Sequence, residues 1–179
     1  ETGVVFGAYD GAVHYVDGET GERLLPDFPT GDIIKSSVTV DPDGYPLVYS
    51  GSRDDRLRVL AIDRDEPLEL WNIHAYDVSP TKWNNDWDSS PLVLDDYLFA
   101  GGENSRFHVI RLNRGYDADG LVTVDPVLVW DVAGWDDELI EAVGGNVSIE
   151  MSPLIIGNTL YFANSGGLVQ GWDIAGLRD

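Results

Sequence analysis

One pattern, written four times, constrains the fold of this chain more than any other feature. In each copy a strand of aromatic or β-branched residues ends in a turn of small residues, and a second strand then closes on Asp or Asn. The closing residues are Asp17, Asp63, Asn113 and Asp173. A further short strand with a Ser pair or Ser-Pro precedes three copies, at 36–37, 89–91 and 152–153. A repeat built of strands indicates a solenoid or a propeller.

A Trp-bearing strand completes two of the copies. Trp71 lies eight residues after Asp63, and Trp130 lies seventeen after Asn113, so the third copy carries a nine-residue insertion. Leu25 holds the corresponding position after Asp17. Each full unit therefore predicts four antiparallel strands, the make-up of one propeller blade.

We predict one all-β domain, 1–179, a β-propeller segment of about three and a half to four blades. The blades are expected at about 3–30, 35–74, 88–133 and 150–177. Because propellers close with about four to eight blades, two alternatives stay open: a fragment of a longer propeller, which the sequence favours, or a half ring that completes itself by dimerising.

Charge and composition exclude some classes of binding partner. The 179 residues carry a net charge of −21, which repels phosphate backbones and anionic lipid heads and attracts cations. No apolar run approaches the roughly 20 residues of a membrane-spanning helix. We therefore expect neither nucleic-acid binding nor membrane insertion. The acidity itself fits either a solvated surface suited to a salty environment or cation binding.

The expected location is extracellular, periplasmic or at the cell surface. The opening Glu1-Thr2-Gly3 is typical of the remnant that a secretion vector leaves, and cysteine is absent. An exported protein without disulfides depends on sheet packing for its stability.

The repeat resembles that of the PQQ-like, or quinoprotein dehydrogenase-like, β-propellers. The matching strings are GAYDG at 7–11, YVDGETG at 15–21, SGSRD at 50–54, AID at 61–63 and SSP at 89–91. The resemblance implies the propeller fold, and it implies that Trp71 and Trp130 dock neighbouring blades. Many members of this superfamily bind no quinone, so the resemblance does not assign an activity.

The long connectors between blades carry the candidate ligand-binding residues. In a propeller these connectors and the turns between second and third strands share one face, here called the connector face. Tryptophan in a long loop either packs the loop onto the fold or binds something. The candidates are Trp83, Asn84, Asn85, Asp86, Trp87, Asp88, Trp135, Asp136 and Asp137. The stretch 136–143 could also form a short helix.

Two cofactor hypotheses follow. The run 83–88 resembles the Asp-x-Trp-Asp run of quinoprotein dehydrogenases, which hold PQQ over a calcium ion. The lack of cysteine for the vicinal disulfide of such enzymes, and the half-ring length, argue against PQQ. Calcium alone is a separate hypothesis, with Asp117, Asp119 and Asp125 as the candidate ligands, although an ordinary Asp-Gly turn explains the same residues.

These observations favour a non-catalytic, exported or cell-surface module for protein or ligand binding or scaffolding. A fragment of a PQQ- and calcium-dependent dehydrogenase and a calcium-binding adhesion or assembly module are the alternatives. The expected partner is a protein, or a second copy of the chain joined through open blade edges, because unpaired strand edges invite pairing.

Overall fold

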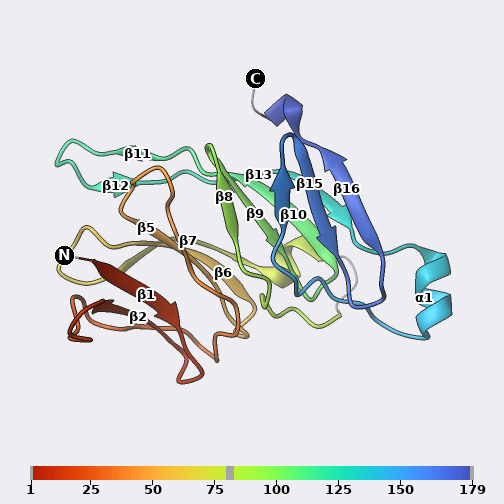
Figure 1. Ribbon diagram of the computed structural model, residues 1–179, viewed down its shortest axis with the longest axis horizontal. Helices are drawn as coiled ribbons and strands as arrows, with labels where there is room; N and C mark the ends of the chain where they lie inside the picture. The colour runs from red at the N-terminus through yellow and green to blue at the C-terminus, as the bar shows by residue number, and fades with distance from the viewer. Residues whose placement is uncertain (1, 80–82, 178–179) are drawn as a thin grey trace.

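The computed structural model describes residues 2–79 and 83–177, and these form an all-β chain of small antiparallel sheets (Figure 1). Four sheets follow one another along the chain and are called sheets 1 to 4 here. The expectation of an all-β chain of antiparallel sheets is confirmed. The described residues do not form a closed ring of sheets, so the propeller arrangement stays a prediction.

Within each sheet, strands that follow one another in the chain are neighbours in space. In sheet 3, β11 and β12 of the insertion come between β10 and β13 in the chain but lie outside the sheet. Sheet 1 contains β1 (Gly3–Gly7), β2 (Ala12–Asp17) and β3 (Phe28–Pro29). Sheet 2 contains β4 (Thr39–Val40), β5 (Leu47–Gly51), β6 (Arg56–Ala61) and β7 (Leu68–His74). Sheet 3 contains β8 (Leu92–Leu94), β9 (Tyr97–Gly101), β10 (Arg106–Arg111) and β13 (Val127–Ala133). Sheet 4 contains β14 (Leu154–Ile156), β15 (Thr159–Ala163) and β16 (Val169–Asp173).

The remaining elements lie outside these sheets. The insertion forms a hairpin of β11 (Gly115–Tyr116) and β12 (Val122–Thr123), and short 3-10 turns span Ala75–Val78 (η1) and Ala175–Leu177 (η2). Helix α1 (Asp137–Val143) lies in the connector after sheet 3 and extends away from the sheets (Figure 1). The expectation of a short helix in this connector is confirmed.

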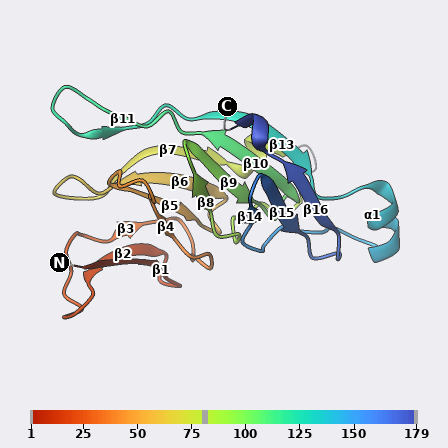
Figure 2. The ribbon, with the colours of Figure 1, turned by 45° about the horizontal axis from the view of Figure 1, so that its top comes forward.

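The sheets lie in series, with sheets 1 and 4 at opposite ends of the molecule (Figure 2). One apolar cluster fills each joint between neighbours. Val13 and Val48 share the cluster between sheets 1 and 2, and Phe99 and Phe162 share that between sheets 3 and 4. Both faces of the middle sheets are therefore buried: Val48 faces sheet 1, while its neighbour Tyr49 lies in the cluster with sheet 3.

Trp71 and Trp130 occupy equivalent places in sheets 2 and 3. Each lies opposite the residue at which the strand register shifts, Val59 for Trp71 and Val109 for Trp130. Trp71 packs against the cluster between sheets 2 and 3, and Trp130 packs against that between sheets 3 and 4. Leu25 lies outside the strands, because the third strand of sheet 1 is reduced to Phe28–Pro29.

Candidate functional site

A hydrogen-bond pattern repeated three times builds the connector face. In each connector one residue donates its N–H back to the turn of the preceding sheet, and the residue before it accepts an N–H from the turn of the next sheet. The donors of the first kind are Ile34 to Ala8, Trp87 to Ser52 and Ile149 to Gly102, at 3.0–3.2 Å. The donors of the second kind are Arg53 to Ile33, Glu103 to Asp86 and Ser165 to Ser148, at 2.9–3.1 Å. The three connectors thus place equivalent residues side by side on one face.

The central residue of this pattern is a buried wedge between two sheets. Ile34, Trp87 and Ile149 are each at most 2% exposed. In the sheet before each wedge, glycine ends the strand that leads into the turn: Gly7 ends β1, Gly51 ends β5 and Gly101 ends β9. A Cβ at Gly51 would lie 2.2 Å from the carbonyl oxygen of Trp87, and one at Gly101 would lie 2.3 Å from Ile149 Cγ2. The wedge and its glycine therefore form one packing unit.

Trp87, a candidate ligand-binding residue, is this wedge in the second connector. It is 1% exposed, its Nε1 donates to the carbonyl oxygen of Asp55 at 3.1 Å, and its ring lies 5.1 Å from that of His108. Trp87 therefore packs inside the joint between sheets 2 and 3, and its ring does not face solvent. Its neighbours Asn85 and Asp86 are also buried.

Charged side chains flanking the wedges gather into one group, called the central cluster: Lys35, Arg53, Asp88, Glu103 and Glu150. Arg53 Nη2 lies 2.8 Å from Asp88 Oδ2 and 3.5 Å from Glu103 Oε1, and Lys35 Nζ lies 3.7 Å from Asp88 Oδ2. Arg53 Nε also lies 3.4 Å from Asp86 Oδ2. Positive charge thus lies toward sheets 1 and 2, and negative charge toward sheets 3 and 4.

Glu103 has the most perturbed carboxyl group of the cluster. Burial raises its pKa to about 7, and a hydrogen bond with Asp88 and the negative charges of Asp86, Asp88 and Glu150 add to this rise. Burial also raises the pKa of Asp86, partly offset by Arg53. Asn84 donates its amide to both Glu103 and Asp86. The face therefore contains a carboxyl group that changes charge near neutral pH.

Three carboxylates of the cluster could hold a cation. Oxygen atoms of Asp88, Glu103 and Glu150 all lie within 4.8 Å of one another, the one such group of three that the described residues form. Hard oxygen ligands suit Ca²⁺, but Arg53 already supplies positive charge to Asp88.

The predicted calcium ligands Asp117, Asp119 and Asp125 do not form such a group among the described residues. Asp117 instead accepts the N–H groups of Asp119 and Leu121, both at 2.9 Å, in the turn between β11 and β12. These contacts are those of an Asp-Gly hairpin turn, the other explanation that the sequence offered.

Trp83 and Trp135 meet on the connector face. They come from successive connectors, and their ring centroids lie 5.4 Å apart at an interplanar angle of 55°. Both side chains are half-buried, and Trp135 Nε1 is buried without a hydrogen-bond partner among the described residues. Trp83 thus contacts a second aromatic ring that carries this donor, and the residue after it, Asn84, donates to Glu103.

Asp136 and Asp137 serve helix α1. Asp136 is its N-cap, with Oδ1 accepting the N–H of Leu139 at 2.8 Å, and Asp137 adds negative charge to the first turn. Such contacts stabilise a helix start. Both residues are exposed and lie outside the central cluster.

Sequence reasoning named Asp86 and Asp88 but left Lys35, Arg53, Glu103 and Glu150 out of the site. Lys35, Asp88 and Glu150 each follow a wedge residue, and Arg53 and Glu103 take the same place in successive turns. Aligning the connectors on Ile34, Trp87 and Ile149 would have found them. The signal is weak because three unlike residues share each position.

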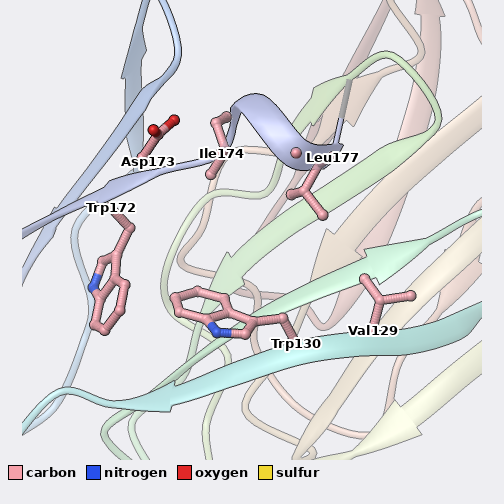
Figure 3. Close-up of a pocket in the computed structure, with 7 residues that line it drawn as sticks. Val129, Trp130, Trp172, Asp173, Ile174 and Leu177 are labelled. Atoms are coloured by element: carbon pink, nitrogen blue, oxygen red, sulfur yellow. The ribbon is translucent and has the colours of Figure 1, made fainter. Parts of the chain in front are cut away.

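A separate pocket of about 280 Å³ opens between sheets 3 and 4. Trp130 and Trp172 flank it, with ring centroids 5.1 Å apart in an edge-on arrangement, and Ile174 and Leu177 of the segment after β16 lie above them (Figure 3). Its lining is mostly apolar, with Asp173 as the charged residue. The pocket lies next to the outer edge of β16, where sheet 4 has no fourth strand.

Comparison with known proteins gives a likeness of fold alone. No family model and no curated protein matches the chain. A solved structure described as the computationally designed Ika4 protein is similar over 98% of this chain and 87% of its own, with a TM-score of 0.63 and 18% sequence identity. Among the described residues, no helix has the length and apolar character needed to cross a bilayer.

Proposed function

We propose that this chain is a non-catalytic, propeller-type module of the PQQ-like kind, exported or at the cell surface, that binds a positively charged segment of a protein partner through its connector face. The observation that carries the proposal is the contact between Trp83 and Trp135, because the residue after Trp83, Asn84, donates its side-chain amide to the carboxylates of Glu103 and Asp86.

The chemistry of this face suits a cation. Aromatic faces attract ammonium and guanidinium groups, and a desolvated carboxylate pairs with them. The pKa of Glu103 is raised to about 7 by burial first, and then by the hydrogen bond to Asp88 and the negative charges of Asp86, Asp88 and Glu150, so Glu103 is partly protonated near neutral pH. An incoming Lys or Arg side chain would release that proton and neutralise the excess negative charge of the cluster. The net charge of −21 would steer such a segment toward the molecule.

A lysine-rich peptide titrated into the protein by calorimetry tests this proposal. We expect Trp83→Ala combined with Glu150→Gln to weaken binding by about tenfold or more, because the pair removes a cation–π contact and a charge. Asp119→Asn in the distant hairpin also removes one negative charge and is the matched control for general charge attraction. Equal weakening by the double variant and by this control would show that the peptide senses only the net charge, and would contradict the proposal.

Calcium binding by the central cluster is the second candidate function, favoured by the approach of Asp88, Glu103 and Glu150 to within 4.8 Å. Calorimetry with calcium alone tests it. Heat at millimolar calcium or below that is lost in Glu150→Gln, and kept in the hairpin control, would support a site at this face. No similar observation favours PQQ. The run 83–88 resembles quinoprotein dehydrogenases, but its residues Asp86 and Trp87 are buried.

A further inference from the structure

The two end sheets each leave one apolar face uncovered. On sheet 1 the exposed side chains are Val4 and Phe6 of β1, 44% and 42% exposed. On sheet 4 they are Leu154, Ile156, Tyr161 and Val169, 38–68% exposed. Clusters of this kind on a folded chain mark interaction surfaces.

The strand pairing shows which face each end sheet presents. Gly7, Gly51 and Gly101 end equivalent strands, so Val4 corresponds to Val48 in sheet 2 and to Leu98 in sheet 3. Val48 packs toward sheet 1 and Leu98 toward sheet 2, and both are fully buried. Sheet 1 therefore exposes the face that sheets 2 and 3 bury against the sheet before them.

Sheet 4 exposes the opposite face. Leu154 lies opposite Tyr161 in the same way that Leu92 lies opposite Phe99, and Val169 takes the place of Phe107. In sheet 3 these positions pack against sheet 4, and Phe107 stacks on Phe162 with ring centroids 4.4 Å apart. The uncovered faces of sheets 1 and 4 are thus the two halves of a joint that the chain already forms three times.

Residue 163 indicates how the missing joint is made. In the sheets before the three joints, the strand that leads into the turn ends in Gly7, Gly51 or Gly101, because the wedge of the following connector leaves no room for a Cβ. Sheet 4 has Ala163 at this position. A wedge of the kind seen at the three joints would overlap the Cβ of Ala163, so this residue favours a covering sheet that comes without such a connector.

We propose that a second copy of this chain covers both faces, with sheet 4 of each copy packed on sheet 1 of the other. A partner that is a separate chain brings no connector, and each copy offers both halves of the joint at opposite ends. Two such joints close a pair of copies into a ring of eight sheets, within the range that propellers adopt. This inference concerns the end sheets and does not depend on the ligand proposed for the connector face.

Light scattering and native mass spectrometry on the 179-residue chain test the proposal. We expect a species of twice 19.7 kDa at tens of micromolar protein, favoured by added salt because each copy carries −21 charges. Phe6→Lys and Val169→Glu occupy the places of the stacked Phe162 and Phe107. Each change alone should weaken the dimer by about a hundredfold or more, because the homodimer would bury the new charge twice.

Mixing the two variants should restore the dimer, because one joint of the mixed pair is unchanged and the other pairs Lys with Glu. Leu68→Lys on sheet 2, 46% exposed, is the matched control and should leave the dimer intact. Circular dichroism of each variant verifies that it folds. A monomeric parent chain, an open polymer, or a dimer broken by only one of the two changes would each overturn the proposal, the last because it indicates like faces in contact.

Discussion

At the scale of single residues, the repeat puts unlike side chains into equivalent places, and their chemistry follows from their neighbours. Arg53 and Glu103 occupy the same turn position in successive sheets and lie 3.5 Å apart. His108, at the place of Arg58, is fully buried, and burial lowers its pKa to about 4. Arg58, by contrast, keeps its charge through ion pairs with Asp54 and Glu69. The same buried position thus holds a neutral histidine in sheet 3 and an ion-paired arginine in sheet 2.

The raised pKa of Glu103 gives a pH-dependent prediction. With a pKa of about 7 in the folded state against an ordinary value of 4.5, Glu103 binds a proton more tightly when folded, so its contribution to stability is complete below pH 4.5 and is lost as the pH rises through 7. We expect Glu103→Gln to stabilise the protein relative to the parent by up to about 2–3 kcal/mol above pH 7, and little at pH 4.5. Urea unfolding at both pH values measures this difference.

His108 has the opposite effect on the parent chain, since its neutral form is favoured by folding and stability is lost as the pH falls from 6.5 toward 4. Because both proteins contain His108, its effect cancels in the comparison. A constant difference between Glu103→Gln and the parent across this range would contradict the proposed protonation of Glu103.

At the scale of elements, the joint between sheets depends on a wedge and a glycine. We expect Gly51→Ala and Gly101→Ala each to destabilise the protein by about 1–3 kcal/mol, because the new methyl group overlaps Trp87 or Ile149. Ile149→Ala should relieve part of the strain in Gly101→Ala, whereas the obstacle at Gly51 is the backbone oxygen of Trp87 and has no such relief.

Thermal unfolding of the single and double variants measures these effects. Gly145→Ala is the matched control, because a Cβ at Gly145 has open space around it. Equal stability of Gly51→Ala and Gly145→Ala would show that the wedge does not restrict this strand end.

The inserted hairpin makes a different contact. Arg114, at its start, is 5% exposed and pairs with Asp41 and Asp43 of sheet 2 at 2.6 and 2.9 Å, and its guanidinium lies 4.8 Å from the Tyr45 ring centroid. Val122 in β12 lies in the cluster between sheets 2 and 3. The inserted hairpin therefore links sheet 3 to sheet 2, and this link is called the strap.

We expect Arg114→Leu to lower the free energy of unfolding by about 3 kcal/mol or more, because it leaves the fully buried carboxylate of Asp41 without its cation. Arg111→Leu is the control. The Arg111 side chain is 55% exposed, and its Nε lies 3.7 Å from Asp96 Oδ2. Exposed ion pairs of this kind contribute less than about 1 kcal/mol. Urea unfolding measures both values, and similar losses of unfolding free energy in the two variants would contradict a stabilising role of the strap.

Sequence reasoning found the strands because residues such as Val48 and Tyr49 repeat in equivalent places around small-residue turns. It named both Trp83 and Trp135 as candidates because their connectors were expected on the same face, but it did not predict that their rings touch. It named Trp87 as a ligand-binding candidate and kept packing of the loop onto the fold as the alternative, because nothing in the sequence distinguishes a wedge from a loop tryptophan. Ile34 and Ile149 reveal the role only once the backbone hydrogen bonds are known. Asp117 was ambiguous for a similar reason, since a turn and a metal loop use the same residues.

At the scale of the whole molecule, the four sheets form a series in which neighbours pack on one another through an apolar cluster at each joint. In such an array the inner units are stabilised from both sides and the end units from one. β5, β6, β9 and β10 are almost wholly buried, whereas β1 and β16 are mostly half-buried or exposed.

Hydrogen exchange should therefore be slowest in sheets 2 and 3 and faster in sheets 1 and 4 when the chain is monomeric. The Val169→Glu variant keeps the end sheets free for this measurement. In the parent chain at high concentration, protection of β1 and β15 should rise if a second copy covers them. Uniform protection across all four sheets of the variant would contradict a series of separable joints.

The strap formed by the inserted hairpin has a mechanical consequence. Trp87 holds the joint between sheets 2 and 3 at the connector face, and the hairpin holds it through Arg114 and Val122. Within residues 2–79 and 83–177, the outer joints have no such hairpin. Bending of the molecule should therefore concentrate at the two outer joints, with sheets 2 and 3 moving as one stiff block. A series of sheets with a rigid middle and compliant ends can adjust the distance and angle between its two end sheets.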